Sequence, residues 1–60
     1  MASETVEWTL GQLQAKVRGA KQPNPADPNL WWKAGLYIRL VSNLPGGRVR
    51  IVLTEGACTC

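Results

Sequence analysis

Two runs of β-prone residues joined by a short turn constrain this chain more than any other feature. The run LYIRLVSN at 36–43 and the run RVRIVL at 48–53 flank the segment Leu44–Gly47. Pro45 supplies the fixed φ of the first turn corner, and Gly46 accepts the positive φ that a type II turn needs at the second. The pattern therefore predicts a β-hairpin with a four-residue loop.

A loop of four residues separates the hairpin side chains into two faces. Because side chains alternate along a strand, Leu40 then lies opposite Ile51, and both point the same way. One face is apolar and consists of Leu36, Ile38, Leu40, Val49, Ile51 and Leu53. The other consists of Tyr37, Arg39, Val41, Arg48, Arg50 and Val52. A five-residue loop would mix apolar and charged residues on both faces, so we predict the four-residue loop.

The N-terminal segment has two interpretations. In the first, a short strand precedes a helix that covers about 10–19 and starts after Thr9. Thr9 and Gln12 have the spacing of a capping box, and Trp8 and Leu13 have that of a hydrophobic staple. We favour this interpretation.

In the second interpretation, one helix runs from Ser3 to Arg18. It would place Gly11 in the helix interior, at a cost of roughly 1 kcal/mol relative to alanine.

The middle of the chain connects these parts. Residues 20–30, AKQPNPADPNL, contain three prolines. Each disfavours helix in the preceding residue, so we predict an extended, semi-rigid connector. The hairpin then covers about 31–54, with Gly35 as a bulge or a point of close backbone approach. Residues 55–60 form a C-terminal tail.

Sixty residues make one small domain. We predict the α+β class, with one helix packed on a twisted antiparallel sheet and the order β-α-β-β or α-β-β. Such a short chain buries only ~60% of the surface of its unfolded form, so it usually needs extra stabilisation. A bridge between Cys58 and Cys60 would close almost no loop. We therefore expect a homo-oligomer or a protein partner.

The same cysteines are weak candidates for metal ligands. Two thiolates are half of a tetrahedral zinc site, and the sequence has no histidine to complete it. We expect no metal and no cofactor.

The two adjacent tryptophans are candidates for a contact surface. Neighbouring residues of a strand point to opposite faces, so one of Trp31 and Trp32 is expected in the core and the other outside. An outward tryptophan could anchor an interface or simply cover the rim of the core. The predicted partner-binding residues are Trp31, Trp32, Tyr37, Arg39, Val41, Arg48, Arg50 and Val52.

The formal net charge of +3 lies in the C-terminal half of the chain. The arginine-bearing face has three possible functions. It could be a protein or assembly interface, or it could only be solvated. It could also bind nucleic acid through Arg39, Arg48, Arg50 and Tyr37. We expect a non-enzymatic protein-binding or self-associating module, of the kind found among small phage and bacterial accessory proteins. Nucleic-acid binding is the alternative.

Several functions are disfavoured by what the sequence contains. It has no histidine to act as a general base and no paired carboxylates, so we expect neither an enzyme nor a small-molecule substrate. No run approaches the ~20 apolar residues of a membrane span, so we expect no membrane partner. The segment MASETVEW lacks the features of a secretory signal, so a cytoplasmic location is expected.

Overall fold

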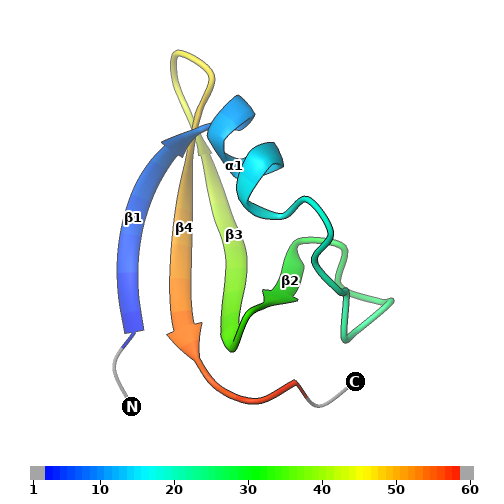
Figure 1. The fold of residues 1–60 in the computed structure, drawn as a ribbon. Coiled ribbons are helices and arrows are strands. Elements are labelled where there is room, and N and C mark those ends of the chain that lie inside the picture. Colours follow the sequence, from blue (N-terminus) through cyan, green and yellow to red (C-terminus); the bar gives the residue numbers. More distant parts are fainter. Residues whose placement is uncertain (1–2, 59–60) are drawn as a thin grey trace.

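A computed structural model describes residues 3–58 as one helix and a four-stranded antiparallel sheet (Figure 1). The elements are β1 (Ser3–Thr9), α1 (Leu10–Lys16), β2 (Leu30–Lys33), β3 (Leu36–Leu44) and β4 (Arg48–Glu55). In space the strands follow the order β1-β4-β3-β2. The α+β class with a C-terminal hairpin is confirmed, but the sheet has one strand more than the order β-α-β-β and two more than the order α-β-β.

A capping box starts the helix, as the sequence predicts. The Gln12 amide donates to Thr9 Oγ1 at 3.1 Å, and the Thr9 amide donates to Gln12 Oε1 at 2.9 Å. The interpretation of a strand followed by a helix is confirmed, and the single long helix is wrong. The helix ends earlier than expected because the backbone leaves helical geometry at Val17, and Gly19 follows with φ +77°.

The hairpin has the predicted pairing near its base and a different one near its tip. Leu40 lies opposite Ile51 as expected, but the loop has three residues, not four, because Leu44 pairs with Arg48. Gly47 takes a positive φ (+74°) in addition to Gly46 (+77°), and this shortens the loop. A bulge between Leu40 and Ser42 then restores the register.

The sequence suggested that Gly35 marks a bulge or a close backbone approach, and this prediction is wrong. Lys33 pairs with Leu36, so Ala34 and Gly35 form a two-residue turn that separates β2 from β3. Both turn residues have positive φ, 53° and 80°, as in a type I′ turn. The predicted hairpin strand from residue 31 onward is therefore two strands.

The core lies between α1 and one face of the sheet. Its four buried side chains are Leu13, Ile38, Val49 and Ile51. Half-buried apolar side chains surround them: Val6, Trp8, Val17, Trp31, Leu40 and Leu53. The separation of the hairpin into an apolar face and a charged face is confirmed, since Arg39, Arg48 and Arg50 are exposed.

The helix covers only part of that face. Seven helical residues span about 10 Å, whereas the nine residues of β3 span about 30 Å. The Leu10 amide donates to the carbonyl of Gly47 at 3.0 Å and holds α1 at the loop end of the hairpin (Figure 1). The other end of the sheet has no helix over it. No helix among residues 3–58 is long and apolar enough to cross a membrane.

Candidate interaction surfaces

The sheet face turned away from α1 carries most of the residues predicted to bind a partner, and we call it the arginine face. Its cross-strand rows follow from the register: Thr54, Tyr37 and Trp32 form one row, and Val52 and Arg39 lie in the next. Arg50 and Arg48 follow towards the hairpin loop. The structure thus brings these predicted residues to one face.

Each of the three arginines is paired with a carboxylate of the same chain. Arg39 Nη1 lies 2.8 Å from Asp27 Oδ2. Glu7 receives both others, with Arg48 Nη2 at 3.0 Å and Arg50 Nη2 at 3.9 Å from its oxygens. Two carboxylates against three guanidinium groups leave these five side chains with a formal charge of only +1. Half-exposed pairs of this kind contribute about 0–1 kcal/mol each, so they stay exchangeable.

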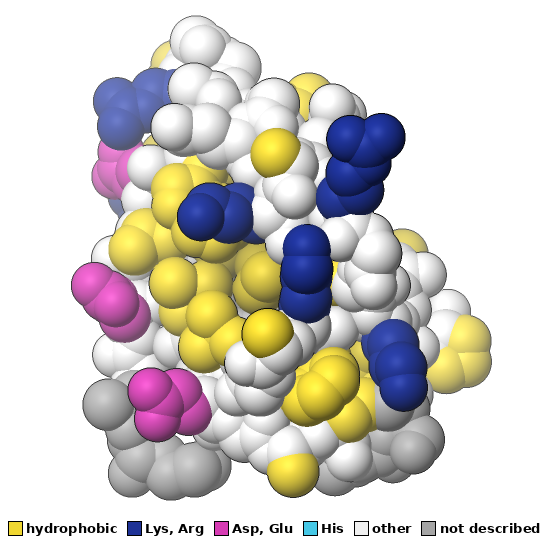
Figure 2. All heavy atoms as spheres, in the orientation of Figure 1, with side chains coloured by type: hydrophobic (Ala, Val, Ile, Leu, Met, Phe, Trp, Pro, Cys, Tyr) yellow, Lys and Arg dark blue, Asp and Glu magenta, His cyan; other side chains and the backbone are white. Residues whose placement is uncertain are grey.

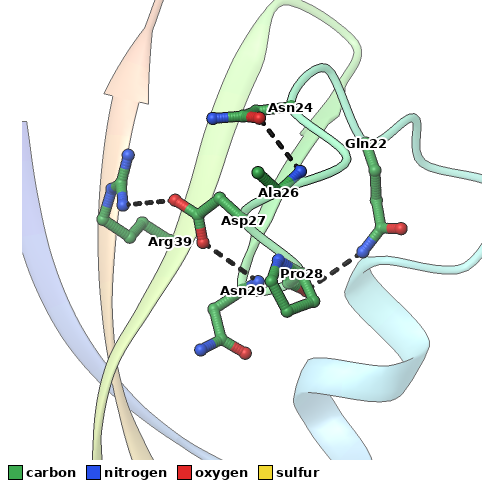
Figure 3. Close-up of polar contacts among 7 residues, drawn as sticks. All are labelled: Gln22, Asn24, Ala26, Asp27, Pro28, Asn29 and Arg39. Carbon is green, nitrogen blue, oxygen red and sulfur yellow. Dashed lines mark hydrogen bonds and ion pairs between the residues drawn. The ribbon is translucent and has the colours of Figure 1, made fainter.

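Asp27 comes from the proline-containing connector, which folds back instead of running extended (Figure 3). Its carboxylate also accepts the Asn29 amide at 3.3 Å, and Asn24 Oδ1 accepts the Ala26 amide at 3.0 Å. The Asn29 carbonyl accepts the Leu40 amide at 2.9 Å, which ties the connector to the free edge of β3. The expectation of an extended connector is wrong because the Asn and Asp side chains satisfy backbone amides locally and so stabilise turns.

The two tryptophans point to opposite faces, as predicted. Trp31 packs against the core. Trp32 lies on the arginine face, where its indole N–H donates to the Gly56 carbonyl at 2.8 Å. The Tyr37 hydroxyl donates to the Ala57 carbonyl at 2.7 Å. The C-terminal segment therefore engages both rings, and neither projects from the surface as a free anchor.

The two valines of the predicted site differ in exposure. Val41 occupies the bulge and is 46% exposed. In residues 3–58, Val41 and Leu10 are the two large apolar side chains that are exposed. A four-residue loop would place Val41 opposite Arg50, but Ser42 lies opposite Arg50 instead. Val52 is half-buried between its neighbours Thr5 and Arg39.

The uncovered part of the opposite sheet face forms a second surface, which we call the helix-side groove. Its apolar lining comes from both strands and helix: Trp8, Ala15, Ala34, Leu36, Ile38 and Leu53. Lys16 and Lys33 line it as well. Figure 2 shows apolar side chains gathered on this side of the molecule, with acidic side chains on the β1 and β4 side, basic ones on the α1 and β2 side, and further basic ones at the hairpin-loop end.

Charged side chains flank the groove in the same cross-strand rows as its apolar lining. Glu55 lies opposite Leu36, which in turn lies opposite Lys33. Glu4 lies opposite Leu53 in the neighbouring row. The face is thus acidic on one side and basic on the other.

Sequence reasoning placed Leu36 and Leu53 on the apolar face but did not expect them to line an open groove. The available signal was length, because seven helical residues cannot cover strands of eight and nine. The Lys33 side chain also lines the groove and so lies on the opposite face from the three arginines.

The cysteine tail provides no metal site within the described part of the chain. Cys58 is engaged in a disulfide, so its sulfur is not a thiolate ligand. Cys60, the other weak candidate, lies outside the described residues. No group of three or more His, Cys, Asp or Glu residues gathers among residues 3–58.

The chain was compared with known families, curated proteins and solved structures. No protein family, no curated protein and no solved structure matches the chain.

Proposed function

We propose that this chain is a non-enzymatic interaction module that associates with itself or with a protein partner. The observation that carries the proposal is the helix-side groove, where the apolar face of the sheet continues beyond the end of α1. Apolar lining with charged residues at its rim is the usual composition of a protein interface. A chain of this size also gains stability by covering such a surface.

The arginine face supports the alternative, nucleic-acid binding, less well. In its favour, the side chains of Arg39, Arg48 and Arg50 are 49%, 54% and 46% exposed. Against it, all three are paired with Asp27 or Glu7, and a phosphate would have to displace these carboxylates. Tyr37 and Trp32, the rings available for stacking on bases, are held by the C-terminal segment.

Salt dependence separates the two functions. Three phosphate contacts give a slope of about −2.7 in log affinity against log salt, so binding falls about 40-fold between 50 and 200 mM salt. An apolar interface changes far less over this range. The measurements are the anisotropy of labelled single- and double-stranded oligonucleotides and the mass in solution by light scattering.

We expect weak oligonucleotide binding and a mass that is insensitive to salt. Two variants serve as a matched pair: Leu36→Gln alters the groove, and the combined change of Arg39, Arg48 and Arg50 to Gln alters the arginine face. Tight oligonucleotide binding with the steep slope, lost in the arginine variant and kept in Leu36→Gln, would contradict the proposal.

A further inference from the structure

The two faces of the sheet differ in how their charges are satisfied. On the arginine face, every arginine has a carboxylate partner in the same chain. Around the helix-side groove, Glu4, Glu55 and Lys16 are exposed and form no ion pair within residues 3–58. Charges without an ion-pair partner thus flank the uncovered apolar surface, although Arg18 and Lys21 elsewhere among the described residues form none either.

One cross-strand row shows the pattern most clearly. Glu55 of β4, Leu36 of β3 and Lys33 of β2 lie side by side and point to the groove face. Neighbouring strands are about 4.8 Å apart, so the backbones of Glu55 and Lys33 flank that of Leu36 at nearly equal distances. Across the row, the three side chains are acidic, apolar and basic in that order.

Lys33 is held in this place by the segment that follows α1. Its Nζ donates to the carbonyl of Arg18 at 2.7 Å. An ammonium group has three donors, so two remain for a further acceptor. The basic side of the row is thus oriented before any partner arrives.

We propose that the groove binds a second copy of this chain, related by a two-fold axis that runs along the strands over Leu36. Such a rotation reverses the row, so that Glu55 of each copy faces Lys33 of the other, and Leu36 faces Leu36. The interface is then isologous, with the same patch used by both copies. This inference rests on the proposed function and specifies its partner.

The short helix makes the approach sterically feasible. Face-to-face sheets pack about 10 Å apart, and α1 would hold the two sheets further apart than this if it covered the whole face. It begins at the loop end and ends beside the groove, where Ala15 and Lys16 line it, so the rows at Leu36 can meet while the loop ends of the two copies diverge.

The charge pattern favours a second copy over a partner of single sign. A basic segment would face Lys16 and Lys33, and an acidic segment would face Glu4 and Glu55. Like charges set opposite one another in an interface are destabilising. A copy of the chain itself presents both signs in the order needed.

Complementary charge reversals test the register. In a Lys33→Glu homodimer, two glutamates face each other at both ends of the row; in a Glu55→Lys homodimer, two lysines do. Mixing the two variants restores an opposite-charge pair at both ends of the heterodimer. The measurement is the mass against concentration by analytical ultracentrifugation, for each variant alone and for the equimolar mixture.

We expect the wild-type chain to move from 6.6 kDa towards twice that mass as its concentration rises. Each single variant should associate roughly tenfold more weakly, and the mixture should return to the wild-type affinity. Thr5→Glu and Thr5→Lys place either charge on the arginine face and should change nothing. Circular dichroism verifies that each variant is folded.

Three results would overturn the inference. A wild-type chain that stays monomeric up to millimolar concentration would exclude the second copy. This result alone would leave the proposed function standing, since the groove could still bind another protein. The proposed function would fail as well if oligonucleotides bound with a slope of log affinity against log salt as steep as that of three phosphate contacts. Wild-type self-association that the charge reversals leave unchanged, or that mixing fails to restore, would reject this interface but keep the self-associating module.

Discussion

The start of α1 depends on one side chain. Thr9 accepts the Gln12 amide, and Gln12 returns a hydrogen bond to the Thr9 amide. In a helix of seven residues, these bonds satisfy a large share of the amides that have no partner within the helix. The capping residues and the apolar residues of the hairpin are the features that the sequence predicts best, because both are set by neighbours along the chain.

Replacement of this threonine tests the cap. We expect Thr9→Ala to lower the free energy of unfolding by about 1 kcal/mol, because the Gln12 amide loses its acceptor. Urea denaturation at fixed protein concentration measures the change. Thr5→Ala, an exposed threonine of the same strand, is the control; a loss as large as that of Thr9→Ala would show that the strand, and not the cap, is affected.

Ala34 has an uncommon backbone conformation. Its φ of 53° lies in the left-handed region, which costs a residue with a Cβ about 1–2 kcal/mol. Asparagine followed by glycine is the preferred pair in a type I′ turn. We expect Ala34→Asn to raise the free energy of unfolding by roughly 0.5–1 kcal/mol and Gly35→Ala to lower it. If thermal unfolding shows no gain for Ala34→Asn, the turn is not the type I′ described here.

The charge pairs of the arginine face illustrate what the sequence could not predict. Glu7 reaches Arg48 and Arg50 because β1 lies beside β4, and nothing local to either strand specifies that neighbour. Asp27 reaches Arg39 only because the connector turns back over the sheet. Hence the residues of the predicted site other than Trp31 share a face, but the sequence did not show that Glu7 and Asp27 partly neutralise its arginines.

Among the elements, the connector contacts the sheet through the Lys21–Trp32 bridge, the Leu40–Asn29 hydrogen bond and the Asp27–Arg39 ion pair. Asp27 binds the Asn29 amide and Arg39 together, so it couples the turn of the connector to β3 (Figure 3). We expect Arg39→Gln to accelerate hydrogen exchange of the Asn29 and Leu30 amides while changing global stability by less than about 1 kcal/mol.

Hydrogen exchange with mass spectrometry measures this effect. Arg48→Gln removes an arginine whose partner, Glu7, lies in β1, so it should leave exchange in the connector unchanged. Equal acceleration in both variants would mean that the ion pair to Asp27 does not order the connector.

At the scale of the whole molecule, the core is small. Among residues 3–58, four side chains are buried, and Ile51 is the one of these with no exposed area. The accessible area of 4096 Å² is close to the ~3,900 Å² expected for a monomer of this mass, so the groove reflects where apolar surface lies and not an excess of it. The sequence predicts a marginal domain, and the helix length decides where its uncovered surface falls.

Truncation in this core should be costly. A chain of sixty residues has a total stability of roughly 3–9 kcal/mol. We expect Ile51→Val to cost about 1 kcal/mol and Ile51→Ala about 2–5 kcal/mol, enough to unfold much of the population. Urea denaturation checks both, with the exposed Val41→Ala expected within about 0.5 kcal/mol of wild type.

The bulge at Val41 has a consequence for how the chain can change in length. β3 has one residue more than β4 requires between Leu40 and Ser42, and pairing is regular on both sides of that point. A deletion there would straighten the ladder without moving any other side chain to the opposite face, whereas β4 has no such surplus. Single-residue deletions should thus be tolerated near Val41 and not at the centre of β4, which makes the bulge the natural place for insertions and deletions to accumulate in this sheet.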